Sequence, residues 1–307
     1  MPDKIPTMQD YMREGRPRKP VQKRLPPWLK KKLPLGDPMA PVRKILANGA
    51  LVTVCEEARC PNLNECWSAG TATFMVMGDI CTRNCGFCAV DGPRKPRALD
   101  PTEPERVATA AAGMKLRHVV ITSVDRDDLP DGGSTHIAAV VSAVREALPT
   151  ARVEVLTPDF RGVSEDILRV LDARPHVYNH NVETVPRLYS TARKMSRYEW
   201  SISLLKLVKD PDPDTFTKSG LMVGLGEEKE ELFQVFADLR EAGCDILTVG
   251  QYLRPSDRHL AVERFVPPEE FDEYYRVAKE LGFRAVASGP FVRSSYHAAE
   301  LFEPVAS

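Results

Sequence analysis

Six of the seven cysteines lie between residues 55 and 88, in two groups of three. The second group is Cys81, Cys85 and Cys88, with gaps of three and two residues and a glycine inside the loop. Structural zinc sites close four positions with paired ligands, so three thiols without a local fourth ligand fit zinc poorly. Three thiolates would instead hold an iron–sulfur cluster and leave one iron free for a ligand from outside the protein.

The first group is Cys55, Cys60 and Cys66, with gaps of four and five residues. It also stops at three thiols, so a second cluster would take a fourth ligand from elsewhere in the chain or keep an open iron. Cys244 is the remaining thiol, but it falls between a predicted helix end and a predicted buried strand. There a free cysteine usually serves as a small hydrophobic residue, and we expect that structural role for Cys244.

The segments that position these thiols alternate between short apolar runs and amphipathic runs. Six buried strands are predicted, at residues 72–77, 117–122, 152–157, 176–181, 218–224 and 245–250. Helices are predicted between and after them, at residues 103–114, 134–148, 164–172, 227–242 and 268–281. This alternation predicts an α/β fold with a parallel sheet and right-handed crossovers. Six units are too few for a closed (β/α)8 barrel, so we expect a partial (β/α)6 barrel of TIM type, with a doubly wound sheet as the alternative.

Polar residues follow the ends of the predicted strands, where the loops of such barrels build active sites. Ser123 and Asp125 follow the second strand, Asn181 and Glu183 the fourth, and Arg254 the sixth. Each of these residues could instead belong to an ordinary solvated loop or turn. His180, taken alone, would more often be a core histidine with its hydrogen bonds made than a ligand. Their shared placement favours a common site beside the Cys81 loop.

Charge is balanced overall, with 42 Lys and Arg against 43 Asp and Glu, so composition gives no case for nucleic-acid binding. Residues 1–40 nevertheless hold ten basic and four acidic residues, and many prolines. We expect an extended basic arm there, either a solvated tail or a segment that covers the body or meets an acidic partner. No apolar run is long enough for a membrane span or a secretion signal, so a cytoplasmic protein without membrane attachment is expected.

With both trios in view, the chain resembles the lipoyl synthase family of the radical S-adenosylmethionine (SAM) superfamily. Four features carry the resemblance: the two cysteine spacings, with Phe87 before the last cysteine; Asn-His-Asn-Val-Glu-Thr-Val-Pro at 179–186; Gly-Gln-Tyr-Leu-Arg-Pro at 250–255; and Val-Arg-Ser-Ser-Tyr-His-Ala at 292–298. The resemblance implies insertion of two sulfur atoms, at C6 and C8, into a protein-bound octanoyl-lysine. SAM-derived 5′-deoxyadenosyl radicals would break the C–H bonds, which side-chain acids and bases cannot open.

The resemblance also implies a role for each cysteine trio. Cys81, Cys85 and Cys88 would hold the [4Fe–4S] cluster that binds SAM, and Cys55, Cys60 and Cys66 an auxiliary [4Fe–4S] cluster that donates sulfur. The fourth ligand of the auxiliary cluster would be a serine of the Arg-Ser-Ser-Tyr motif. The resemblance favours Ser295, although the residues alone do not separate it from Ser294 and also fit a helix cap. An alkoxide is a weaker anchor on iron than a thiolate, which suits a cluster that is dismantled.

Contacts to SAM and substrate are expected from six residues at the strand ends and the cluster loop: Phe87, Ser123, Asp125, Asn181, Glu183 and Arg254. No side chain is assigned a catalytic role beyond cluster ligation. Expected partners are octanoylated lipoyl carrier domains (2-oxoacid dehydrogenase E2 or glycine cleavage H protein), an electron donor such as flavodoxin or ferredoxin, and an iron–sulfur carrier protein. The basic arm would help to cover the auxiliary site and steer the carrier.

Four regions are expected: the basic arm at 1–50, an auxiliary-cluster segment at 51–70, the radical SAM partial barrel at 71–282, and a C-terminal extension with the serine motif at 283–307. Two other functions stay open at this point. One is another radical SAM enzyme that inserts sulfur or methylthio groups. The other is a metal-stabilised binding module without catalysis, for which zinc in place of iron would be the signature.

Overall fold

Short apolar runs form the strands of a single sheet in the computed structural model, which describes residues 24–30, 39–57, 60–212, 214–296 and 298–306. The strands follow each other in space as they do in sequence, and β2 to β8 are parallel. They are β1 (Val52–Thr53), β2 (Thr71–Val76), β3 (His118–Ser123), β4 (Arg152–Leu156), β5 (Val177–Asn179), β6 (Phe216–Val223), β7 (Ile246–Gln251) and β8 (Ala285–Gly289). All six residues of β2 are buried, as expected for a strand covered on both faces.

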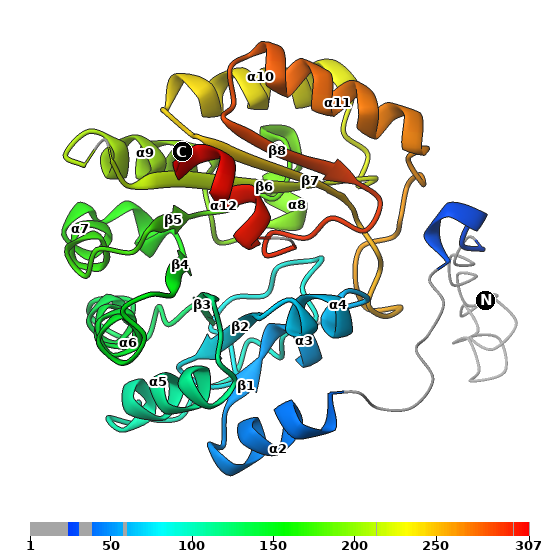
Figure 1. Ribbon diagram of the computed structural model, residues 1–307. Helices are drawn as coiled ribbons and strands as arrows, with labels where there is room; N and C mark the ends of the chain where they lie inside the picture. The colour runs from blue at the N-terminus through cyan, green and yellow to red at the C-terminus, as the bar shows by residue number, and fades with distance from the viewer. Residues whose placement is uncertain (1–23, 31–38, 58–59, 213, 297, 307) are drawn as a thin grey trace, which may run out of the picture.

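Helices cross over from each parallel strand to the next and form an outer arc around the sheet (Figure 1). These are α5 (Glu103–Gly113), α6 (Ser134–Ala147), α7 (Ser164–Asp172), α9 (Tyr198–Lys209), α10 (Lys229–Glu241) and α11 (Pro268–Glu280). The shorter or peripheral helices are η1 (Pro27–Leu29), α2 (Ala40–Asn48), α3 (Val54–Glu57), α4 (Leu63–Ser68), η2 (Phe160–Gly162), η3 (Pro186–Leu188), α8 (Tyr189–Ala192) and α12 (Ala298–Ala306). The five predicted helices are confirmed, each within two residues at either end.

The sheet has the sequential order of a barrel but runs from β1 at one edge to β8 at the other, so the barrel is partial. A doubly wound sheet reverses its strand order at a switch point, and no reversal occurs here, so that alternative is wrong. The six predicted strands are confirmed as β2 to β7. Two further strands were not predicted: β1, which is antiparallel to β2, and β8, which extends the sheet into the segment expected as a C-terminal extension.

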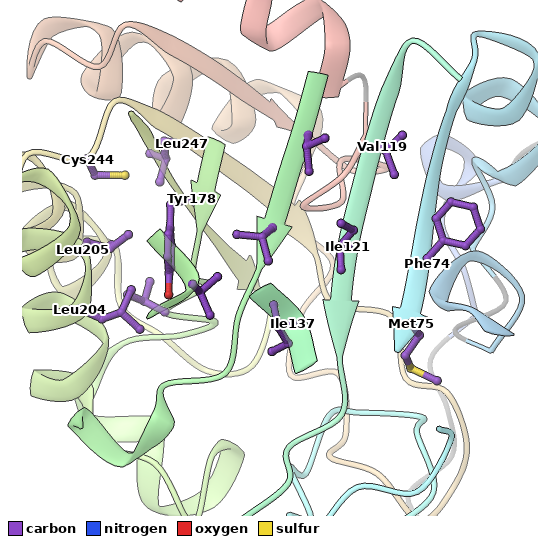
Figure 2. Packing of buried hydrophobic residues seen from close by; sticks show 14 of the residues in the cluster. Phe74, Met75, Val119, Ile121, Ile137, Tyr178, Leu204, Leu205, Cys244 and Leu247 are labelled. Atoms are coloured by element: carbon purple, nitrogen blue, oxygen red, sulfur yellow. The ribbon is translucent and has the colours of Figure 1, made fainter. Parts of the chain in front are cut away.

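The main core lies between the sheet and the outer helices. Figure 2 shows Tyr178 and Leu247 of the sheet near Leu204 and Leu205 of α9, and Cys244 beside them. Cys244 is fully buried among these apolar side chains, between α10 and β7. Its predicted structural role is therefore confirmed, and it lies away from the cysteine groups in the sequence and outside the cavity described below.

The C-terminal segment runs from one end of the barrel to the other. Phe302 of α12 packs edge-on against His118 and Phe216, which are the first residues of β3 and β6. Its ring also receives the guanidinium of Arg152, the first residue of β4, at 5.1 Å. The helix thus covers the amino ends of the strands, and the segment before it lies at the carboxyl ends, where the predicted site residues are found.

The N-terminal region is described only in part. Residues 1–23 and 31–38, with most of the basic residues of the expected arm, lie outside the described residues. Within the part of that region that the structure describes, Ala40–Asn48 forms a helix, α2, which packs on α5. The expected extended arm, residues 1–40, is described only at residues 24–30, 39 and 40, where Pro27–Leu29 forms the short helix η1. In the described chain no helix combines the length and the apolar character that a membrane crossing requires.

Candidate functional site

The Cys81 loop begins where β2 ends, at a turn with positive φ angles at Met77 (68°) and Gly78 (91°). The Met77 N–H donates to Glu103 Oε2 at 2.9 Å, which holds this turn against α5. Backbone bonds then fix the loop: Cys81 N donates to Asp91 O at 2.8 Å, and Gly86 N to Ala192 O at 2.9 Å. The three thiols of the loop, Cys81, Cys85 and Cys88, line a cavity of about 360 Å³ at the carboxyl ends of the strands.

Arg83 anchors the same loop from inside. It is 4% exposed, and its Nε donates to Asp127 Oδ2 at 2.7 Å while its Nη1 donates to Asp159 Oδ2 at 2.9 Å. The two carboxylates follow β3 and β4, so a single guanidinium ties the cysteine loop to two strand ends. Such planar, bidentate pairing fixes orientation as well as distance.

The first cysteine trio faces the same cavity from the edge of the sheet. Cys55 lies in α3, Cys66 in α4, and Cys60 between the two helices, and all three line the cavity wall. Trp67, next to Cys66, is 5% exposed and packs in the core beside this trio. Both trios predicted from spacing are thus brought to one cavity, from segments that adjoin β2 on either side.

The Arg-Ser-Ser-Tyr segment is fastened directly to the first trio. Asn62, between Cys60 and Cys66, donates through Nδ2 to Phe291 O at 2.7 Å. Tyr296 donates its phenolic O–H to Glu65 Oε1 at 3.0 Å. The approach also depends on Gly250 at the end of β7, because a Cβ there would lie 2.1 Å from the carbonyl oxygen of Val292.

The two serines of this segment differ in their contacts. Ser294 donates to Asn181 Oδ1 at 3.0 Å and accepts from Asn179 Nδ2 at 2.9 Å. Ser295 also lines the cavity, and among the described residues no such pair of amide groups contacts its hydroxyl. The helix-cap alternative does not describe Ser294, whose hydroxyl is engaged by β5 and the loop that follows it.

Five of the six predicted SAM and substrate contacts line the cavity: Phe87, Ser123, Asp125, Asn181 and Glu183. Ser123 Oγ is buried without a partner among the described residues, as is Thr157 Oγ1 on the same wall. Glu183 holds a φ of 65°, a conformation that costs a non-glycine residue about 1–2 kcal/mol, and its backbone is locked to Gly220 and Met222 of β6. This backbone conformation accompanies a half-buried carboxyl group at the cavity wall.

Arg254 is the exception among the predicted contacts. It lies outside the cavity lining, and its guanidinium donates to the carbonyl oxygens of His259 at 2.9 Å and Asp257 at 2.6 Å. His259 in turn contacts the carbonyl oxygen of Cys88 through Nε2 at 2.8 Å. Arg254 therefore supports the loop that packs on Cys88, and its contact with SAM or substrate stays a prediction.

Other cavity residues were not singled out from the sequence. Arg193 is buried, donates to Asn181 O at 2.9 Å and follows the Asn179 motif by a few residues. Arg83 lies inside the Cys81–Cys88 loop and Arg293 inside the motif at 292–298. Their positions in these two motifs were the only sequence signal that could have marked them as site residues.

The electrostatics of the cavity disfavour free anions. Burial raises the pKa of the Cys81 and Cys85 thiols to about 12, and it raises the pKa of Asp125 to about 6 against the opposing effect of Arg83. Thiolates would therefore form here only with a cationic partner such as iron. In the described part of the chain, no three His, Cys, Asp or Glu side chains are placed to hold a single metal ion.

The residues fit iron–sulfur clusters by their donor chemistry. Each trio supplies three sulfur ligands to a cavity of about 360 Å³, and soft thiolates are the ligands that such clusters require. The Ser123 hydroxyl, which has no partner among the described residues, adds a buried polar group on the wall of this cavity.

Comparisons with known proteins agree with this chemistry. The profile of the radical SAM superfamily matches residues 75–239, and that of the N-terminal domain of lipoyl synthase of the radical SAM family matches residues 2–60. The lipoyl synthase of Rubrobacter xylanophilus is 51% identical over 97% of this chain and 90% of its own length. The lipoyl synthase of Acidithiobacillus ferrooxidans is 56% identical over 91% of this chain and 88% of its own length.

Among solved structures, SuiB of Streptococcus suis bound to its precursor peptide matches with a TM-score of 0.57 and 14% identity, over 85% of this chain and 56% of that chain. HydG, a maturase of the [FeFe]-hydrogenase, matches with a TM-score of 0.53 and 14% identity, over 80% and 62%. At this level of identity the two structures support the fold alone.

Proposed function

Because the chain belongs to the lipoyl synthase family of the radical SAM superfamily, we propose that its two cysteine trios hold the two clusters of this family's reaction in one cavity. The activity is that of lipoyl synthase, which inserts two sulfur atoms into a protein-bound octanoyl chain and uses SAM and two [4Fe–4S] clusters. The alternatives of a different sulfur-inserting enzyme and of a noncatalytic module are set aside by relatives that are 51% and 56% identical over nearly the whole chain.

The assignment of the trios is our proposal. Cys81, Cys85 and Cys88 would hold the SAM-binding cluster, because their loop is fixed by Arg83 and lies beside the strand-end polar residues. The auxiliary cluster would be held by Cys55, Cys60 and Cys66. When bound, the clusters and SAM supply the electron, the 5′-deoxyadenosyl radical and the sulfur that the chemistry requires.

For the fourth auxiliary ligand we propose Ser295 rather than Ser294. The Ser294 hydroxyl is already used by Asn179 and Asn181, and an oxygen that is held by two amides is poorly placed to bind iron as well. Ser294 then serves to hold the segment, and the adjacent Ser295 is presented to the cavity. The Asn62 and Tyr296 contacts keep this segment against the Cys60 and Cys66 region.

The side chains of the cavity would bind and orient SAM and the octanoyl chain and exclude water. We propose that Phe87, Ser123, Asp125, Asn181 and Glu183 contact SAM or the octanoyl chain, since all five line the cavity. The apolar part of the wall, which includes Met75, Leu156, Leu221 and Met222, suits an acyl chain. A largely apolar wall also limits side reactions of a carbon radical with water.

From the family's chemistry we also propose specific partners: E2 or H-protein carrier domains, flavodoxin or ferredoxin as the electron donor, and an iron–sulfur carrier protein. We further propose a cytoplasmic location. The observation that carries the proposed assignment is the convergence of both trios on one cavity. The test is strictly anaerobic reconstitution, with SAM, reductant and an octanoylated carrier peptide, followed by mass spectrometry. The unchanged protein should add two sulfur atoms, whereas Cys60→Ala should still cleave SAM but form no lipoyl product.

The matched control is Cys244→Ala, since Cys244 is buried in the core outside the cavity. Its effect should be confined to stability, with product formation preserved at permissive temperature. Lipoyl product from Cys60→Ala would show that the auxiliary trio is not the sulfur source.

A further inference from the structure

Arg293 places a guanidinium on the wall of the cavity, next to the first cysteine trio. It lies between β8 and the serines of the C-terminal motif and lines the same cavity as Cys60. Its Nη1 donates to the Val292 carbonyl oxygen at 2.6 Å. The same Nη1 would lie 3.4 Å from a Cβ atom added to Gly250. Gly250 therefore leaves room for the Val292 backbone and lies beside the Arg293 guanidinium.

Three arginines line this cavity, and they differ in how their charge is balanced. Arg83 is paired with Asp127 and Asp159, and Arg193 lies 4.0 Å from Asp159. Arg293 has no ion pair within the described chain, and its Nη1 donates to a neutral carbonyl oxygen, that of Val292. One of the three cations is therefore without a carboxylate partner.

A guanidinium stays protonated in proteins, and an enclosed charge without a counter-ion is unfavourable. The segment that carries Arg293 is held against the first trio on both sides, because Asn62 donates to the carbonyl oxygen of Phe291 and Tyr296 donates to Glu65. The missing negative charge is thus expected on the side of the first trio.

We propose that Arg293 is the charge partner of the auxiliary cluster and raises the reduction potential of that cluster by balancing its negative charge. This inference rests on the proposed function, which places an auxiliary cluster on Cys55, Cys60 and Cys66. The anionic ligands of such a cluster outweigh its core charge, and net charge and nearby donors are among the factors that set its potential. A fixed cation stabilises the more negative, reduced state.

The test isolates the auxiliary cluster. In a chain with Cys81, Cys85 and Cys88 all replaced by Ala, anaerobic reconstitution should load only the first trio, and iron and sulfide analysis measures the loading. Arg293→Gln, Arg293→Lys and the control Arg276→Gln are then compared by redox titration followed by electron paramagnetic resonance. Arg276 is exposed on α11 and is not part of the cavity wall, so its replacement removes the same charge away from the site.

Arg293→Gln should lower the equilibrium constant for cluster reduction about tenfold, a shift of about 59 mV to more negative potential for a one-electron couple. Arg293→Lys should recover most of this shift, and Arg276→Gln should produce none. An unchanged potential in Arg293→Gln would overturn the inference, as would an equal shift in Arg276→Gln. If the parent chain loads no cluster at all on the first trio, the proposed function fails; if it loads one and the Arg293 variants do not move its potential, only this inference fails.

Discussion

Replacing the two adjacent serines one at a time should separate a structural role from a ligand role. Ser294 makes two side-chain hydrogen bonds, to Asn181 Oδ1 at 3.0 Å and from Asn179 Nδ2 at 2.9 Å. Ser295 makes no comparable pair of contacts and lies at the same cavity. Ser294→Ala is therefore a change in the support of the segment, whereas Ser295→Ala removes the proposed ligand and leaves the support in place.

The magnitudes follow from the contacts. Each hydrogen bond contributes about 0.5–1.5 kcal/mol net, so Ser294→Ala should lower the free energy of unfolding of the cluster-free protein by about 1–3 kcal/mol. Ser295→Ala removes a partly exposed hydroxyl, and its effect on the same free energy should stay within about 0.5 kcal/mol. For binding of the auxiliary cluster, Ser295→Ala should have the larger effect. The Ser294→Ala protein should retain this cluster, and the Ser295→Ala protein should bind it more weakly.

Two assays measure these effects independently. Urea unfolding of the cluster-free, reduced protein gives the midpoint and slope, and an unchanged slope means that the midpoint reports stability. Iron and sulfide per chain, followed over time with a chelator present, report retention of the clusters. If Ser294→Ala loses the auxiliary iron faster than Ser295→Ala while both keep the parent's midpoint, the assignment of the two serines is wrong.

Three further predictions use other parts of the structure. Arg83→Gln removes the guanidinium that pairs with the fully buried Asp159 and should lower the free energy of unfolding in urea by about 3–5 kcal/mol. The control Arg187→Gln breaks an exposed pair with Glu231 and should lower it by no more than about 1 kcal/mol. Equal effects of the two changes would contradict the anchoring role of Arg83. Burial opposes ionisation of Glu154, but Lys218 and His118 outweigh burial and lower the pKa of Glu154 to about 2. The contribution of ionised Glu154 to the free energy of unfolding is therefore fully present above about pH 4.5 and is lost as pH falls from 4.5 to 2. Urea midpoints measured over this pH range should show the loss, and a Glu154→Gln/Lys218→Met protein should lack it. Deleting residues 1–23 should reduce the rate on an acidic carrier domain and flatten its salt dependence; an unchanged rate and slope would remove the steering role of the arm.

The sequence predicted the repeating part of the fold well, because that part depends on local patterns. Apolar runs bounded by turns marked β2 to β7, and the helix starts at Glu103, Ser134 and Pro268 carry the expected proline, serine or acidic residues. The strand β1 has two residues, and β8 is Ala-Val-Ala-Ser-Gly with only its first two residues buried. Neither has enough apolar periodicity to be recognised without its neighbours in the sheet.

The thiols of the site were also evident from the sequence, because ligand type and spacing are properties of the chain itself, whereas the serine ligand is implied only by the family resemblance. The sequence alone identified two sets of three thiols and their chemistry. It also predicted that Cys244 would be buried rather than a ligand, since a single thiol between a helix and a strand carries no spacing signal.

Only the tertiary structure decided how distant segments meet. Tyr296 reaches Glu65, and Ser294 reaches Asn179 and Asn181, across more than a hundred residues of sequence, and such contacts depend on sheet order and on the room left by Gly250. For the same reason Arg254, which follows a strand like the other predicted contacts, turned out to bind the backbone of its own loop instead of lining the cavity. Residue types and spacings set which chemistry is available, whereas the packing of strands and loops sets which side chains share a cavity, because side-chain direction and charge pairing depend on neighbours that no local pattern records.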